Sequence, residues 1–98
     1  MKILALGRDV EGVTDEQFAP HLEAEARRVW ELHQAGVIRE MYFRADEDSA
    51  VLVLECAHLG EAREALATLP LVREGLIAFD LVPLRAYPGF ARLFGPRP

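Results

Sequence analysis

Cysteine is almost absent from this chain, which has only Cys56 in 98 residues. One thiol cannot form a disulfide within the chain, and no Cys and His residues have the spacing of a zinc site. We therefore predict no structural metal. We expect Cys56 to be a small buried apolar residue.

The sequence also lacks the motifs that identify several common enzyme classes. It contains no nucleophile elbow, no phosphate-binding loop and no glycine-rich dinucleotide fingerprint. Hydrolase and nucleotide-dependent functions therefore have no support in the sequence.

Long apolar runs and basic clusters are missing as well. No segment approaches the ~20 apolar residues of a membrane span, and the start of the chain lacks the apolar core of a signal peptide. The 11 Lys and Arg residues are scattered and are outnumbered by 16 Asp and Glu, for a net charge of −5. Nucleic-acid partners select a basic face. We therefore expect a cytoplasmic protein that binds neither membranes nor nucleic acids.

Hydrophobic residues, in contrast, make up 51% of the chain. A chain of this length forms one domain, and it buries only about 60–65% of its unfolded surface on folding. So large an apolar share predicts further burial, in a ligand pocket or a subunit interface.

Apolar periodicity predicts six elements. They are a strand over 2–8, a helix over 14–35, a hairpin with arms 37–44 and 50–55, a helix over 59–69 and a strand over 76–82. In the first arm of the hairpin, strict alternation would place Ile38, Glu40, Tyr42 and Arg44 on one face.

Local signals predict where the helices begin and end. Thr14 and Gln17 have the spacing of a capping box, and Pro20 predicts a bend or restart near Ala19. Gly36 is a predicted left-handed cap, and Pro70 prevents the second helix from continuing straight.

The order β-α-β-β-α-β is that of the ferredoxin-like α+β fold, which we predict for residues 1–84. Both helices would cover one face of a four-stranded antiparallel sheet. Because the strands are apolar on both faces, we expect a second copy to cover the other face, in a homodimer or higher homo-oligomer. Residues 85–98 would form an aromatic C-terminal arm that packs on the same or a partner subunit, with 95–98 frayed.

The last third of the chain resembles muconolactone isomerase. The resemblance rests on Leu69-Pro70-Leu71, on the strand that runs through Ile77-Ala78-Phe79-Asp80 to Leu84, and on Tyr87-Pro88. Arg8-Asp9-Val10, which leaves the first strand, is similar too. The resemblance implies a dimeric α+β barrel, in which two ferredoxin-like subunits press their sheets together, and a cofactor-independent proton transfer within a lactone. No catalytic residue of that family is carried over.

Three functions are therefore open. The first is a cofactor-independent isomerase acting on a small hydrophobic acid or lactone. The second is a monooxygenase-like barrel that oxidises an aromatic substrate, because the fold that the resemblance implies also includes antibiotic-biosynthesis monooxygenases. The third is a ligand-binding or structural barrel without catalysis.

Proton transfer next to a carbonyl needs a base and a donor for the developing oxyanion. Glu40 and Tyr42 share one strand face, with Arg44 beyond them, so they could serve as base, donor and anchor for an acidic substrate. The alternative is an exposed stripe, because charged side chains usually face water.

Glu55 and Asp80 are carboxylates in otherwise apolar strands. If buried, either would have a raised pKa; otherwise each lies at a strand end and pairs with an arginine. We list Glu55 as a candidate base, and Asp80 and Arg8 as candidate substrate contacts.

Three polar residues lie on or beside the apolar arc of the first helix. His21 and Glu25 are one turn apart and could share a substrate proton, but no third ligand supports a metal. His33 is a hydrogen-bonded interior histidine or a substrate contact.

Overall fold

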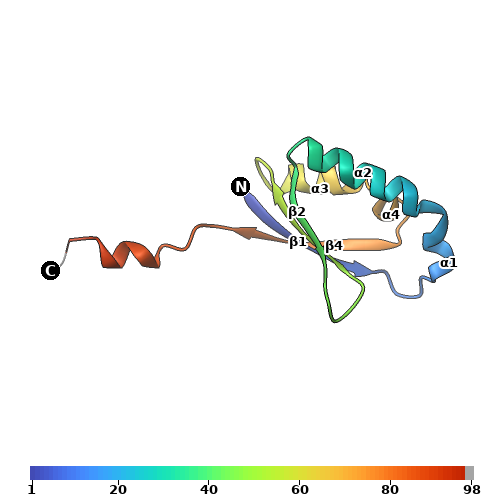
Figure 1. Cartoon of the computed structure of the whole chain (residues 1–98), viewed down its shortest axis with the longest axis horizontal. Helices are drawn as coiled ribbons and strands as arrows, with labels where there is room; N and C mark the ends of the chain where they lie inside the picture. Colours follow the sequence, from blue (N-terminus) through green and yellow to red (C-terminus); the bar gives the residue numbers. More distant parts are fainter. Residues whose placement is uncertain (97–98) are drawn as a thin grey trace.

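The computed structural model describes residues 1–96 and forms one antiparallel sheet with helices on one side (Figure 1). The strands are β1 (Lys2–Asp9), β2 (Ile38–Phe43), β3 (Ala50–Glu55) and β4 (Ile77–Leu84), in the sheet order β2-β3-β1-β4. The helices are α1 (Asp15–Phe18), the 3-10 segment η1 (Ala19–His21), α2 (Leu22–Gln34), α3 (Leu59–Ala67) and α4 (Pro70–Arg73). The predicted ferredoxin-like α+β fold is confirmed.

The first helical region begins and ends as its sequence predicts. The backbone N–H of Thr14 donates to the Gln17 side chain at 2.8 Å, which is half of the predicted capping box. Pro20 lies in η1, so the helix bends there and resumes as α2. Gly36 has a φ of 81°, the left-handed conformation that ends the helix.

The second helical region is shorter than predicted. The helix expected to reach residue 69 ends at Ala67, and Pro70 begins the separate helix α4. Leu69 is extended, with φ −71° and ψ 128°, because proline disfavours a helical conformation in the residue before it. Pro70 itself takes the first helical position, where its missing N–H costs nothing.

The predicted alternation in the first hairpin arm is wrong at Ile38. The register shifts between Ile38 and Glu40, as at a β-bulge, and an extra residue there reverses the faces. Ile38 is paired with Leu54 and Met41 with Leu52, so both face the helices. Glu40 and Tyr42 still share a face, but it is the face opposite Ile38.

The hydrophobic core lies between the helices and the sheet. Ile3, Ile38 and Leu54 are fully buried in it, with Leu32 and Leu66 from α2 and α3 packed against them. Cys56 is also buried here, as predicted. The last strand runs two residues further than expected and contains Pro83, which is tolerated because β4 is an edge strand.

The face of the sheet that points away from the helices is apolar too, and we call it the open face. It carries Leu4, Leu6, Val53, Val82 and Leu84, as the strand register requires. Leu6 is 37% exposed, and Val82 and Leu84 are each 40% exposed.

The chain beyond β4 extends away from the domain (Figure 1). It contains the 3-10 segment η2 (Gly89–Leu93), and Tyr87 and Phe90 pack edge to face with ring centroids 5.1 Å apart. Phe90 is 67% and Phe94 85% exposed. Fraying is predicted for residues 95–98, and of these 97–98 lie outside the described residues. Within residues 1–96, no helix is long and apolar enough to cross a membrane.

Candidate functional site

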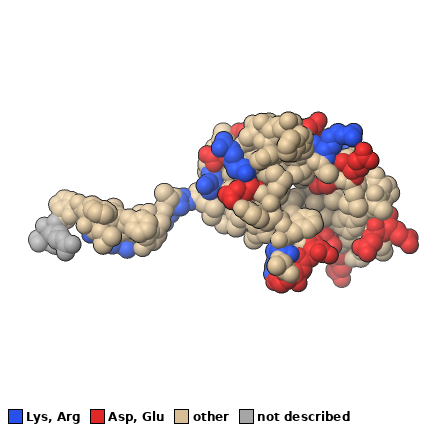
Figure 2. Space-filling view, in the orientation of Figure 1, with Lys and Arg blue, Asp and Glu red and all other residues tan. Residues whose placement is uncertain are grey.

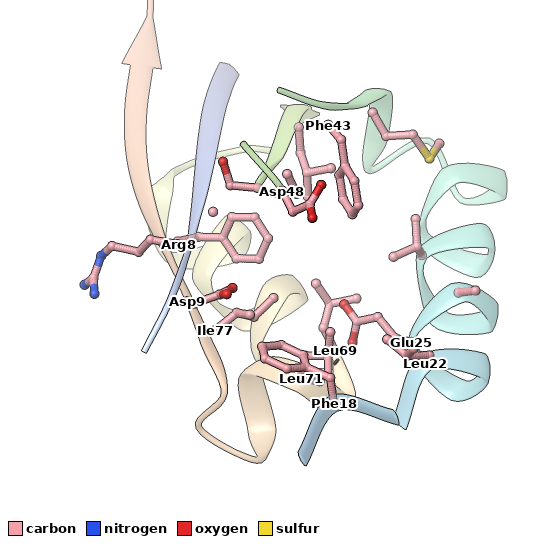
Figure 3. Close-up of a pocket in the computed structure, with 18 of the residues that line it drawn as sticks. Arg8, Asp9, Phe18, Leu22, Glu25, Phe43, Asp48, Leu69, Leu71 and Ile77 are labelled. Carbon is pink, nitrogen blue, oxygen red and sulfur yellow. Dashed lines mark hydrogen bonds between the residues drawn. The ribbon is translucent and has the colours of Figure 1, made fainter. Parts of the chain in front are cut away.

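A cavity of about 810 Å³ opens between α2 and the helix-facing side of the sheet, beside the β2–β3 turn (Figure 3). Its walls are mostly apolar. The helical walls contribute Phe18, Leu22, Val29, Leu69 and Leu71, and the sheet contributes Met41, Phe43, Leu52, Ile77 and Phe79.

Glu25 places a carboxyl group in this apolar cavity (Figure 3). It lies three residues after Leu22 and four before Val29, so the helical repeat directs it to the same side as these apolar residues. Its Oε1 accepts a hydrogen bond from the backbone N–H of Leu71 at 2.9 Å. Burial raises the pKa of Glu25, and the Leu71 hydrogen bond opposes that rise only in part.

A carboxyl group of this kind suits proton transfer. Its raised pKa brings it closer to neutral pH, where a general base or acid works best. The hydrogen bond from Leu71 fixes one oxygen of Glu25, and burial removes part of the carboxyl group from water.

Glu40 and Tyr42 lie together, as predicted, but both are exposed. The Tyr42 hydroxyl donates to Glu40 Oε1 at 2.7 Å. This hydrogen bond and the charge of Glu40 raise the pKa of Tyr42. Arg44 lies beyond the end of β2 and binds Asp46 and Glu47 at 2.6 Å each, so it does not join the other two.

Arg8 and Asp80 lie side by side on the open face. Arg8 Nε lies 3.4 Å from Asp80 Oδ2, and both side chains are exposed. Figure 3 shows the Arg8 side chain directed away from the cavity, although its neighbour Asp9 lines it. Asp80 therefore pairs with an arginine, one of the two possibilities that the sequence left open.

The remaining predicted residues do not reach the cavity. Glu55 lies 3.5 Å from the N-terminal ammonium group of Met1. His33 Nδ1 lies 2.8 Å from the Ile38 carbonyl oxygen, so it donates there and ties α2 to β2. His21 is half-buried at the end of η1 and is not among the cavity residues.

From the sequence, Glu25 was considered only as a partner of His21, so its role as a candidate base in its own right was missed. The informative signal was an acidic residue inside the apolar arc of α2. Gly7 was a second signal: a Cβ there would come within 3.1 Å of the Phe79 ring, so this glycine leaves room for a wall of the cavity.

Comparisons with known proteins bear on the fold. No family model matches the sequence, and no curated protein matches it either. The crystal structure of muconolactone isomerase at 3.3 Å resolution is similar, with a TM-score of 0.71 over 90% of this chain and 92% of that chain. The sequences are 15% identical over this match, so the similarity establishes the shared fold.

Proposed function

We propose that this protein binds a small molecule in the cavity between α2 and the sheet and moves a proton within it, without a cofactor. The observation that carries the proposal is Glu25, a carboxyl group of raised pKa on a helix whose neighbouring cavity residues are apolar. The shared fold with muconolactone isomerase supports an isomerase of this general type.

In the proposed reaction, the Glu25 carboxylate takes a proton from a carbon next to a carbonyl group of the ligand. The C–H electron pair moves into an enolate, and Glu25 becomes a carboxylic acid. Glu25 then returns the proton to a different carbon, so the ligand is isomerised and the enzyme is restored. Leu71 holds Oε1 of Glu25 throughout, which leaves Oε2 as the oxygen directed to the ligand.

We further propose that two copies associate through the open face to form a dimeric α+β barrel. The apolar side chains on that face support this, because an exposed apolar sheet marks an interaction surface. Glu40 and Tyr42 lie on the same face and would then line the barrel. We place the reaction at Glu25 rather than Glu40, because Glu40 is exposed and already binds Tyr42.

The proposed reaction is tested by hydrogen–deuterium exchange at carbon. Substituted γ-lactones with an apolar side chain are incubated with the protein in D₂O, and deuterium uptake is followed by NMR. Glu25→Gln should lower the exchange rate by about 100-fold or more, the usual contribution of a general base. Glu23→Gln is the matched control, since Glu23 lies on the same helix with its side chain 88% exposed.

The possible outcomes distinguish proton transfer by Glu25 from the other two candidate functions. Equal exchange in both variants would remove Glu25 as the base. Binding without exchange in the unmodified protein would favour a non-catalytic barrel. Oxygen consumption with an aromatic ligand would favour the monooxygenase-like reading.

A further inference from the structure

We propose that the cavity selects an apolar organic cation, such as an aromatic amine, over an acidic ligand, which is one of the two ligand classes that the sequence left open. This inference names the ligand class of the proposed binding cavity and rests on that cavity. It comes from the distribution of charge around the cavity and from the aromatic rings in its walls.

The ionised groups that line the cavity are all acidic once the direction of Arg8 is taken into account. Carboxylates reach it from four separate elements: β1 through Asp9, α1 through Asp15, α2 through Glu25 and the β2–β3 turn through Asp48. Arg8 is the basic residue among the lining residues, but its side chain points away and pairs with Asp80 (Figure 3).

These carboxylates keep their charge unbalanced. Within residues 1–96, Asp9, Asp15 and Asp48 take part in no ion pair. Asp46 and Glu47, in the same turn as Asp48, both bind Arg44, whose single positive charge balances only one of their two negative charges. Acidic side chains also gather around the α1 end of the domain and at the β2–β3 turn (Figure 2). An anion entering the cavity is therefore repelled, and a cation is attracted.

The walls add a second kind of cation recognition. Phe18, Trp30, Phe43 and Phe79 line the same cavity. The face of an aromatic ring attracts a cation, and an ammonium group among rings and carboxylates is bound by both effects. Trp30 is 58% and Phe43 72% exposed, so the core leaves much of both side chains free for a ligand.

An inorganic cation fits the cavity less well than an organic one. Within the described part of the chain, no three His, Cys, Asp or Glu side chains converge as metal ligands. The carboxylates are instead distributed around a wide apolar space, which suits a molecule with an apolar body and one positive charge.

The test compares three ligands of the same shape: 2-phenylethylamine, 2-phenylethanol and phenylacetate. Their binding to the full chain is measured by NMR titration at neutral pH, in low and in high salt. The amine should bind about tenfold or more tightly than the acid, with the alcohol between them. Added salt should weaken binding of the amine and leave the alcohol unchanged.

Two exposed acids provide the matched pair of variants. Asp48→Asn removes a charge that lines the cavity, and it should lower the ratio of amine to acid affinity several-fold. Glu64→Gln removes the same charge from an exposed position on α3 outside the cavity, and it should leave the ratio unchanged. Equal loss in both variants would mean that net charge, rather than the cavity, selects the amine.

The outcomes keep this inference apart from the proposed function. If phenylacetate binds as well as the amine or better, the cation preference is wrong and the cavity remains a ligand site. If none of the three ligands shifts the resonances of the cavity residues, both the cation preference and the proposed binding cavity are overturned.

Discussion

At the scale of single residues, Glu25 differs from the other acids of the chain in its surroundings. Asp46, for example, is exposed and is held by Arg44, whose hydrogen bond lowers the pKa of Asp46. The carboxyl group of Glu25, in contrast, is partly removed from water by burial and accepts one hydrogen bond from a backbone N–H. The pKa values of these two acids are therefore shifted in opposite directions, and so their contributions to stability change with pH in opposite directions.

The raised pKa of Glu25 predicts a pH dependence of stability. The native state binds the Glu25 proton more tightly than the unfolded state does, so the contribution of Glu25 to the free energy of unfolding falls as pH rises from its ordinary pKa of 4.5 through its raised native value. Glu25→Gln cannot titrate and should lack this fall. Urea unfolding of both proteins between pH 4 and 8 measures it.

The free energy of unfolding of Glu25→Gln is subtracted from that of the wild type at each pH. This subtraction is needed because acids with a lowered pKa contribute to the pH dependence of stability with the opposite sign. Asp46 stabilises the fold above its ordinary pKa and loses that effect as pH falls. A constant difference between the two proteins across the whole pH range would contradict the assignment of Glu25.

Tyr42 provides a second prediction at this scale. Its pKa is raised first by the hydrogen bond to Glu40 and then by the charge of Glu40. Glu40→Gln should therefore lower the pKa of Tyr42, as measured by ultraviolet titration of the phenol. Both proteins carry Tyr87→Phe, which leaves Tyr42 as the only tyrosine of the chain in the titration. A Tyr42 pKa that is unchanged by Glu40→Gln would mean that the bond is not kept in solution.

At the scale of elements, local signals in the sequence predicted most boundaries and none of the long-range detail. Gly36 and Pro70 act on their immediate neighbours, so the sequence is enough to place the helix ends near them. The shift of register after Ile38 depends on pairing with β3, and no residue in the sequence indicates it. For the same reason, the acidic residue in α2 was visible, but its partner Leu71, 46 positions away, was not.

Gly7 in β1 offers a test of how the sheet shapes the cavity. A side chain there would meet the Phe79 ring at 3.1 Å and the Ala50 carbonyl oxygen at 3.3 Å. Gly7→Ala should therefore destabilise the protein by about 1–3 kcal/mol, the usual cost of overpacking, and should weaken ligand binding as Phe79 is displaced. Chemical denaturation and ligand titration measure the two effects.

Gly60→Ala is the control for this prediction. An added Cβ at Gly60 would also have a neighbour at 3.1 Å, but that neighbour is the exposed His58 side chain. The His58 Nδ1 accepts a hydrogen bond from the backbone N–H of Glu61 at 3.1 Å and caps α3, so a shift of this ring weakens the cap, whereas alanine favours the helix. These two effects oppose each other, so this variant should stay close to the wild type in stability. If Gly7→Ala is as stable as Gly60→Ala, the close packing against Phe79 is not needed.

At the scale of the whole molecule, two apolar surfaces lie without a partner in the single chain. The open face has the apolar side chains that the sequence predicted on both sides of the strands. The arm carries exposed aromatic residues away from the domain, so its packing on the same or a partner subunit stays a prediction. Association of two copies would remove the open face from water.

The open face predicts that the chain of 11.0 kDa sediments at micromolar concentration as a dimer or larger species. Leu6→Lys places a charge at the middle of that face, where Leu6 is 37% exposed, and should dissociate the oligomer without unfolding the subunit. Ala67→Lys, at the exposed end of α3, is the control and should leave the oligomer intact. A wild-type monomer, or a Leu6→Lys protein that stays associated, would contradict the barrel. Because Leu6 lies on the face opposite Glu25, a Leu6→Lys monomer that still binds ligand would place the binding site within one subunit.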